Sequence, residues 1–516
     1  MRKIRRFLRK LVRTLLNRNT LFILLLLVQL VALALVVTFL SQHYLPVYMI
    51  LLALDVVLVI YITNTSENPS YKLPWMIAMM VIPVFAGLAY LLVKTDVGHR
   101  VFKRTYEQKV QSTRHCLPED PHTAEDLQKF DPACAGLAAY VRDYGGFPVY
   151  RNRQAEFYPI GEEMFESMKR EIRNARHYIF VEFFIISMGY MWDELLDLLK
   201  ERAQAGVDVR ILYDGFGTQF MMPKKYFSDL EEIGIRCKVF NPFKPLLSSS
   251  QNNRDHRKIL VIDGVTAFTG GINIADEYIN RKRRFGHWKD GGMLCKGEAA
   301  WSFTVMFLQL WEMEQPDTGS IESFRPQVSA GAAYDGFIQP YSDAPVDGES
   351  VGRNVYLDII NNARRYVYIM TPYLIPDHEL VTALTLAAKK GVDVRLMTPH
   401  IPDKWYAYRT AWSYYPELLE GHVRIFEYEP GFVHAKNLSS DDKVGVVGTI
   451  NMDYRSFYLQ FECACAMYGS GVVRDIRKEF EKTLGKCIEI HLEDCSKLSL
   501  PKRIAGWLLR IFAPLL

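Results

Sequence analysis

The sequence has little net charge and few cysteines for its length. Its 516 residues carry 62 Lys and Arg against 58 Asp and Glu, a formal net charge of +4, which is too small to indicate nucleic acid binding. Eight cysteines without C-x-x-C repeats or Cys/His spacing indicate neither a disulfide framework nor a zinc site. We expect mostly buried, reduced thiols at Cys116, Cys134, Cys237, Cys295, Cys463, Cys465, Cys487 and Cys495.

Several common catalytic signatures are also missing. No P-loop, G-x-G-x-x-G or G-x-S-x-G stands in a fitting strand–turn–helix context. No carboxylate cluster suited to Mg²⁺ or Ca²⁺ accompanies the motifs described below. We therefore expect neither a metal nor a cofactor.

Apolar residues are concentrated near the N-terminus, although the mean hydropathy of the whole chain is only −0.03. A transmembrane region over residues 20–94 is predicted, with apolar segments at Leu21–Leu40, Leu45–Ile62 and Leu73–Val93. The first segment is too long for a signal peptide, and no small-x-small cleavage site follows it. Asp55 within the second segment is either a functional group or a residue that lies at a helix–helix contact or near the membrane interface.

Basic residues flank this region on both sides. Residues 1–19 form a predicted basic amphipathic segment suited to an anionic membrane surface. Residues 95–134, predicted as a connector, begin with further Lys and Arg. Both flanks favour the cytoplasmic side, whereas three full spans would place them on opposite sides. Either one segment is re-entrant or Ser41–Tyr44 belongs to an incomplete hairpin.

An internal repeat organises the rest of the chain. Asn174–Ile179 resembles Asn362–Val367, and Gly-Val-Asp-Val-Arg occurs at both 206–210 and 391–395. A His-x-Lys motif and a Gly-rich turn ending in Asn follow in each copy, and the separation between copies falls only from 188 to 178 residues. Four matches in the same order indicate a duplicated unit.

Each copy alternates helical and strand patterns, which predicts a mainly parallel sheet covered by helices. We expect repeats at 135–316 and 351–492, joined by a linker at 317–350, packed as a pseudo-dimer around one site. A C-terminal amphipathic helix is expected over 497–516. This helix either lies at a membrane interface or packs on the protein.

Two His-x-Lys-x4-Asp patterns carry the chemistry. His256 and Lys258 alternate onto one face of a predicted strand, and His434 and Lys436 do the same in the second copy. Two imidazoles and two ammonium groups suit a phosphodiester, because one imidazole can attack phosphorus while the other protonates the leaving alcohol. Asp263 and Asp441 are expected to orient the imidazoles, with Asp442 as an alternative to Asp441.

The Gly-rich turns add candidate substrate contacts. Gly271 lies in the first turn, and Asn273 and Asn451 end the two turns. Backbone and amide N–H groups of such turns can hold the anionic oxygens of a phosphodiester.

This duplicated motif resembles the mark of the phospholipase D superfamily, and the resemblance covers about residues 135–490. Within that superfamily the chain is similar to bacterial cardiolipin synthases, through Asn68-Pro69-Ser70, Thr371-Pro372-Tyr373 and Asn451–Ser456 running into Phe461-Glu462. The resemblance implies an α/β fold of duplicated phospholipase D-like units with mixed or parallel sheets, preceded by transmembrane helices. It adds Glu182 and Glu462 as substrate-binding candidates.

The activity implied by this resemblance is transfer of a phosphatidyl group from one phosphatidylglycerol to another, which yields cardiolipin and glycerol. The implied course runs through a phosphohistidine, with His256 as the favoured nucleophile and His434 as acid and base. The implied location is the bacterial cell membrane, multi-pass. The side on which the active site lies is open, and the unpaired cysteines favour the cytoplasmic side. The expected partners are anionic phospholipids and not nucleic acid.

Three other functions share parts of this pattern. A phospholipase D-type hydrolase, or a phosphatidyltransferase using another alcohol, would carry the same motifs and differ only in its acceptor. A superfamily nuclease is disfavoured by the apolar segments and the small net charge. A non-catalytic membrane scaffold would leave the paired motifs unexplained. The oligomeric state is open.

Overall fold

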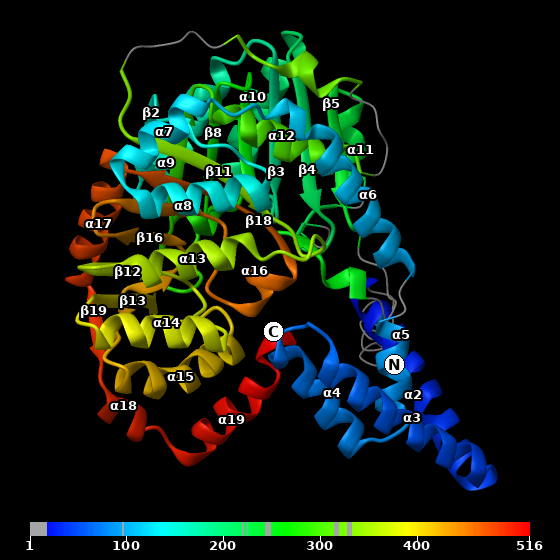
Figure 1. The fold of residues 1–516 in the computed structure, drawn as a ribbon. Helices are drawn as coiled ribbons and strands as arrows, with labels where there is room; N and C mark the ends of the chain where they lie inside the picture. The colour runs from blue at the N-terminus through cyan, green and yellow to red at the C-terminus, as the bar shows by residue number, and fades with distance from the viewer. Residues whose placement is uncertain are drawn as a thin grey trace, which may run out of the picture. The chain divides into compact units, whose positions relative to one another are not determined.

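A computed structural model of the 516-residue chain describes residues 18–94, 97–218, 221–223, 225–242, 249–313, 319–327 and 333–515. The chain divides into two compact units, the first comprising residues 1–102 and 243–252 and the second residues 103–242 and 253–516. Figure 1 shows the elements of both. Residues 1–17 of the predicted basic segment lie outside the described residues.

The first unit is helical. Its helices are α2 (Arg18–His43), α3 (Leu45–Asn64), α4 (Pro69–Val81) and α5 (Phe85–Lys94), and α6 (Val97–Thr113) continues the chain into the second unit. Within the described residues, only the helix Leu45–Asn64, with a mean hydropathy of 2.5, has the length and composition to cross a membrane. A shorter apolar stretch, Leu30–His43, ends α2.

The predicted apolar segment Leu73–Val93 is broken into two helices. The chain turns between α4 and α5 at Pro83 and Val84, where Val84 adopts a φ of 64°. At 1.5 Å per residue, these 13- and 10-residue helices are each shorter than the roughly 30 Å hydrocarbon core. The expectation of three continuous spans is therefore not confirmed.

Asp55 stabilises the turn between α4 and α5. Its side chain on α3 is buried and accepts a hydrogen bond from the Val84 N–H at the start of α5. A Cβ atom on Gly87 would lie 1.8 Å from an Asp55 carboxylate oxygen, so the glycine permits the close approach. Of the two roles considered for Asp55, the helix–helix contact is the one observed.

The second unit opens with α7 (Pro121–Phe130) and α8 (Pro132–Tyr140) and then contains the two repeats. Both helices start with proline after an aspartate whose side chain accepts backbone N–H groups.

The first repeat forms a seven-stranded sheet in the order β2-β10-β8-β7-β3-β4-β5. These strands are β2 (Gln154–Tyr158), β3 (Tyr178–Phe183), β4 (Asp208–Asp214), β5 (Ile235–Phe240), β7 (Lys258–Ile262), β8 (Thr266–Gly270) and β10 (Gly292–Lys296). The helices of this repeat are α9 (Gly161–Arg173), α10 (Tyr190–Gln204), α11 (Tyr226–Glu231) and α12 (Ala300–Trp311).

The second repeat builds a ten-stranded sheet, and six of its strands, in the order β18-β17-β16-β12-β13-β14, reproduce the order β10-β8-β7-β3-β4-β5. These six are β12 (Tyr366–Met370), β13 (Asp393–Pro399), β14 (Arg424–Tyr428), β16 (Asn437–Ser440), β17 (Val444–Gly448) and β18 (Gln460–Tyr468). The others are β1 (Tyr150–Arg151), β6 (Arg254–Asp255), β11 (Phe337–Asp343) and β19 (Cys487–Ile490).

The helices that follow the strands of this repeat are α13 (Val351–Asn362), α14 (His378–Lys389), α15 (Trp405–Glu420), α16 (Tyr454–Tyr458) and α17 (Gly471–Leu484). The chain then ends in α18 (Leu492–Ser496) and α19 (Leu500–Ile511).

Both sheets are mixed rather than mainly parallel. β3, β4 and β5 run parallel, whereas β3 pairs antiparallel with β7, and the second repeat has the same pattern. β3 is buried along its whole length, as its run of apolar residues predicts for a strand covered on both faces. The sequence identifies these strands but does not reveal their direction.

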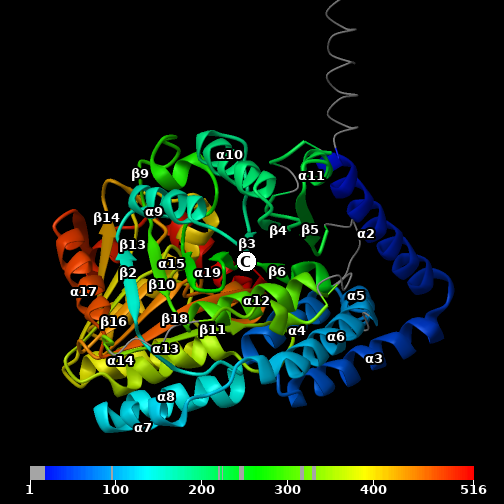
Figure 2. The ribbon, with the colours of Figure 1, turned by 90° about the horizontal axis from the view of Figure 1, so that it is seen from above.

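The two sheets contact each other through β8 and β10 of the first sheet and β17 and β18 of the second. β8 and β10 contact β17, and β8 also contacts β18. α12 contacts β7 of the first sheet and β11 of the second, and Figure 2 shows α12 beside β11. Part of the predicted linker, Phe337–Asp343, is the fully buried strand β11 of the second sheet. Its Gln339 amide donates to the carbonyl oxygens of Ala138 and Phe147, so a polar side chain is satisfied inside the core.

Candidate functional site

The two His-x-Lys motifs lie at the starts of equivalent strands. His256 stands between β6 and β7, and His434 stands between β15 (Gly431–Val433) and β16. Their side chains are buried, with 7% and 6% of the residue surface exposed. β15 pairs with β9 (His287–Lys289) of the first repeat, and β6 pairs with β18 of the second, so each histidine lies where the repeats meet.

Each imidazole is paired with an acid from the opposite repeat. The Nδ1 atom of His256 is 2.9 Å from Oε1 of Glu462, and the Nδ1 atom of His434 is 2.6 Å from Oδ2 of Asp290. Since a carboxylate accepts, Nδ1–H donates in each pair and Nε2 is left as the reactive nitrogen. Neither repeat by itself contains a complete histidine–acid pair.

The two acids occupy matched positions in the duplication. Asp290 lies two residues before Gly292, which pairs with Gly270, and Glu462 lies two residues before Ala464, which pairs with Gly448. The match was missed in the sequence because one copy has Asp and the other Glu. Of the two segments, Phe461-Glu462 stood out in the sequence, through the family resemblance.

The acids are held by different local contacts. The hydroxyl of Thr449 donates to Glu462, whereas Oδ1 of Asp290 accepts from the Gly291 N–H at 2.8 Å. Gly271 is the counterpart of Thr449, one residue past the turn glycine. A Cβ atom on Gly271 would lie 2.0 Å from Asp290 Oδ1 and 2.8 Å from the His434 carbonyl oxygen. Gly271 thus makes room for the His434 centre, while its own N–H donates to Gly291.

Asp263 and Asp441 do not have the orienting role expected from the sequence. The carboxylate of Asp263 accepts three backbone N–H groups of Arg176, His177 and Tyr178 at 2.7–2.9 Å. Asp441 accepts the same three groups of the other copy, from 364, 365 and 366, at 2.7–3.0 Å. The aspartate therefore fixes the repeated Asn-Ala-Arg-x-Tyr segment at the far end of the strand from the histidine. Asp442 instead pairs with Arg365 and Arg477.

The two glutamates expected to bind substrate make contacts within the protein. Glu462 is the partner of His256. Glu182 is fully buried and accepts from Arg257 Nε at 2.6 Å. Arg257 alternates with His256 and Lys258 along the strand, so Glu182 lies on the opposite face of the sheet from the imidazole.

The two asparagines occupy unlike surroundings. Oδ1 of Asn273 accepts from the Ile185 N–H at 3.1 Å, and its amide donates to the Tyr278 hydroxyl at 2.7 Å. In Asn451 the buried Oδ1 has no hydrogen-bond partner within the described part of the chain. A buried amide oxygen in this state is a candidate acceptor for a substrate hydroxyl.

The two lysines complete a cationic site. Lys258 Nζ donates to the His256 carbonyl oxygen at 2.6 Å, and Lys436 Nζ donates to that of His434. Burial lowers the pKa of Lys258 to about 8 and that of Lys436 to about 7. Both lysines remain at least partly charged near neutral pH. A bound anionic phosphodiester would raise their pKa values and favour the charged form.

Both imidazoles are neutral in the substrate-free site. Burial, together with the nearby lysines, lowers the pKa of His256 well below its ordinary value and that of His434 to about 4. The Asp290 carboxylate opposes this shift at His434. The pKa of Glu462 is raised by burial. Burial also opposes ionisation of Asp290, but its interactions with His434 and with the ammonium of Lys436 lower its pKa. The His434 pair is therefore better suited to hold a proton.

Aromatic rings surround the two centres unequally. His434 has Tyr278, Trp288 and Phe432 within 5.4–5.8 Å between ring centroids, whereas His256 has Phe184 at 5.3 Å. These rings come from both repeats.

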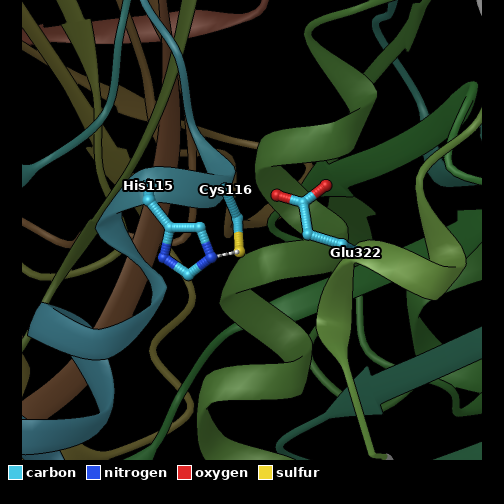
Figure 3. A group of neighbouring side chains, drawn as sticks. All are labelled: His115, Cys116 and Glu322. Carbon is cyan, nitrogen blue, oxygen red and sulfur yellow. Dashed lines mark hydrogen bonds between the residues drawn. The ribbon is translucent and has the colours of Figure 1, made fainter.

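One further group within the described residues has the spacing of metal ligands, namely His115, Cys116 and Glu322. Figure 3 shows the Cys116 sulfur beside the ring of His115, 3.6 Å from Nε2, with Glu322 opposite. Burial and a hydrogen bond to Glu322 raise the pKa of Cys116 to about 11, so this thiol keeps its proton at neutral pH. We assign no metal to this group.

The duplicated α/β units and their shared pair of His-x-Lys motifs define an enzyme of the phospholipase D superfamily. A family profile described as "Cardiolipin synthase, PLD-like domain" matches residues 168–286 and 356–484, which confirms the repeat. One described as "Phospholipase_D-nuclease N-terminal" matches residues 53–94. Phosphatidylserine synthase of Haemophilus influenzae has the same fold, with a TM-score of 0.57 at 15% identity over 74% of this chain and all of that one.

Sequence similarity to known proteins identifies the family within this superfamily. The chain is 32% identical to cardiolipin synthase 2 of Bacillus anthracis over 89% of each chain. It is 32% identical to cardiolipin synthase of Geobacillus kaustophilus over 94% of this chain and 97% of that one. It is also 42% identical to an uncharacterized protein of Streptococcus mutans over 89% of this chain and 99% of that one. The chain belongs to the cardiolipin synthase family, and it is a transferase of the phosphatidyltransferase type.

Proposed function

We propose that this enzyme transfers a phosphatidyl group from one phosphatidylglycerol to the hydroxyl of another, at the membrane, through a phosphohistidine. The observation that carries the proposal is the reciprocal pairing of His256 with Glu462 and of His434 with Asp290. It leaves two Nε2 atoms with different proton affinities in one buried, cationic site. That arrangement suits an in-line exchange of alcohols at phosphorus, with one imidazole as nucleophile and the other as acid and base.

The electrostatics favour His256 as the nucleophile. A nucleophilic imidazole must be unprotonated, and burial, followed by the charge of Lys258, lowers the pKa of His256 well below its ordinary value. His434 faces the ionised Asp290, which stabilises an imidazolium and suits a proton donor. The bound phosphodiester adds a negative charge that would raise the pKa of His434. His434 would therefore become protonated when substrate binds.

The reaction then has two symmetrical halves. Nε2 of His256 attacks phosphorus, the bond from phosphorus to the glycerol oxygen breaks, and His434 protonates that oxygen. The terminal hydroxyl of a second phosphatidylglycerol gives its proton to His434 and attacks the phosphohistidine, and the P–N bond breaks. Cardiolipin and glycerol are the products. One phosphodiester replaces another, so the equilibrium is close to neutral and the reaction is reversible.

Choice of acceptor depends on excluding water from the intermediate. The aromatic walls of Tyr278, Trp288 and Phe432 around His434 are apolar, and they favour an alcohol delivered by a lipid over free water. The apolar helix Leu45–Asn64 supports attachment to the membrane in which both substrates reside.

The test is incubation of the purified full-length enzyme with phosphatidylglycerol alone, followed by separation of lipids and assay of glycerol. Cardiolipin and glycerol in equal amounts are expected. Phosphatidic acid without cardiolipin would instead identify a hydrolase, and new phosphatidyl esters formed only when another alcohol is added would identify a different transferase. Acid-labile, base-stable phosphorus on a peptide containing residue 256 would establish the intermediate.

A further inference from the structure

The C-terminal helix α19 presents an apolar face to the outside of the second unit. It lies beside α15 (Figure 1), where Gly506 approaches the Arg409 carbonyl oxygen and Ser413 closely. On its other side Trp507 is 53% exposed and Leu508 56% exposed. The remaining large apolar side chains that are exposed here are Leu500, Ile504, Ile511, Phe512 and Leu515. A continuous apolar face of this kind marks an interaction surface.

A basic pocket lies directly behind this face. It has a volume of about 270 Å³ and is bounded by α15, α18 and α19. Arg409, Lys502 and Arg503 line it, against one carboxylate, Glu420. The guanidinium of Arg503 stacks 5.5 Å from the centre of the Trp507 ring. Arg510, in contrast, is already paired with Glu417.

We propose that this pocket binds the phosphate of an anionic phospholipid, with α19 lying in the leaflet that supplies it. Three cations against one acid complement an anionic headgroup. The tryptophan and the apolar side chains beside them match the acyl boundary of a membrane, and lysine and arginine can extend along that boundary to reach headgroups. The site is separate from the reacting centre, because neither histidine lines it. The inference rests on the proposed function only for the kind of lipid in the membrane.

Three aromatic residues of α15 are anchored to the second sheet through one buried acid. Tyr408, Trp412 and Tyr415 all donate to the buried carboxylate of Glu427, which fixes α15 on the second sheet. α15 is therefore a rigid support on which the pocket and α19 are built.

The test uses the full-length enzyme with His256→Ala to prevent turnover, reconstituted in nanodiscs of phosphatidylcholine with or without an equal part of phosphatidylglycerol. Acyl chains brominated near the headgroup quench nearby tryptophan, and the difference from the Trp507→Phe variant isolates Trp507. We expect stronger quenching with phosphatidylglycerol than with phosphatidylcholine alone. In detergent titrations, the double variant Lys502→Glu, Arg503→Glu should weaken phosphatidylglycerol binding at least about tenfold.

A double variant on α17, Lys478→Glu with Lys482→Glu, makes the same charge change on exposed residues outside the pocket and should bind like the parent. Equal weakening in both double variants, or equal quenching in both lipids, would overturn the proposal. So would full displacement of the lipid by inorganic phosphate, or a dimer that dissociates in Trp507→Glu and shields Trp507 in both lipids. Cardiolipin synthesis by the parent enzyme is scored separately, so failure of this site and failure of the proposed function are distinguishable.

Discussion

The two histidine centres share a scaffold but differ in almost every contact around the imidazole. His256 meets a glutamate held by a threonine hydroxyl, and His434 meets an aspartate held by a backbone N–H. His434 is enclosed by three aromatic rings, whereas one lies near His256. A duplicated unit placed the two imidazoles symmetrically, and the residues around them have diverged so that one centre suits a nucleophile and the other an acid.

Removing each imidazole is the strongest test of this division. His256→Ala and His434→Ala should both lower phosphatidylglycerol turnover by more than about 10³-fold. A phosphatidyl donor with nitrophenol as leaving group needs no proton donor, so its release of nitrophenol should survive in His434→Ala and be lost in His256→Ala. Stopped-flow absorbance measures this step. The opposite pattern would exchange the two roles.

Exchanging the acids for amides probes the same division with a smaller effect. Asp290→Asn removes the charge that supports a protonated His434, so we expect a loss in kcat of about 10²-fold or more and a shift of the alkaline limb of the pH profile to lower pH. Glu462→Gln still accepts the His256 Nδ1–H hydrogen bond and should cost less. Equal losses and equal profiles in the two variants would contradict the proposed asymmetry.

Gly271→Ala should damage only one centre. Its new methyl group would enter the space of Asp290 Oδ1 and the His434 backbone, and displacement of about 1 Å at a reacting group can cost about 10²-fold in rate. Nitrophenol release should be less affected than turnover of phosphatidylglycerol. Gly136→Ala on α8 is the matched control, because a Cβ atom there meets nothing within 4 Å.

Loss of charge on Lys258 and Lys436 should lower kcat/KM as pH rises. Their pKa values of about 8 and about 7 are lowered by burial, so the ammonium charge is present below these values and is lost as pH rises through them. We expect kcat/KM for phosphatidylglycerol to fall above pH 7. Lys436→Arg should retain the charge and move this limb upward, whereas Lys436→Met should lower kcat/KM and flatten the limb.

Asp263 and Asp441 should behave alike and affect stability more than chemistry. Asp263→Ala or Asp441→Ala leaves three backbone N–H groups without an acceptor, at a cost of about 1–3 kcal/mol in the free energy of unfolding. Chemical denaturation of the full-length protein in detergent measures this cost, with exposed Asp475→Ala as control. If folded Asp263→Ala protein lost turnover as severely as Asp290→Asn, the structural assignment of Asp263 would fail.

Helices and strands of the two repeats could be predicted closely because each has local signals. The helix α9 and the strand β3 follow from an apolar face and from a continuous apolar run. β11 falls in the predicted linker because the stretch around it is rich in Gly, Pro, Ser and Asp, yet the strand is covered on both sides. Local sequence does not show that a polar side chain such as Gln339 will have buried hydrogen-bond partners far away in the chain.

What the sequence determined by itself was the duplication, the two His-x-Lys motifs and the superfamily, since repetition in a fixed order needs no coordinates to be recognised. The tertiary structure decided which acid serves which histidine. Glu462 lies 206 residues from His256 and Asp290 lies 144 residues from His434. No spacing rule connects such residues. Asp263 and Asp441 were chosen because each is close to its histidine in sequence. Each lies at the opposite end of a strand from that histidine and accepts backbone N–H groups there.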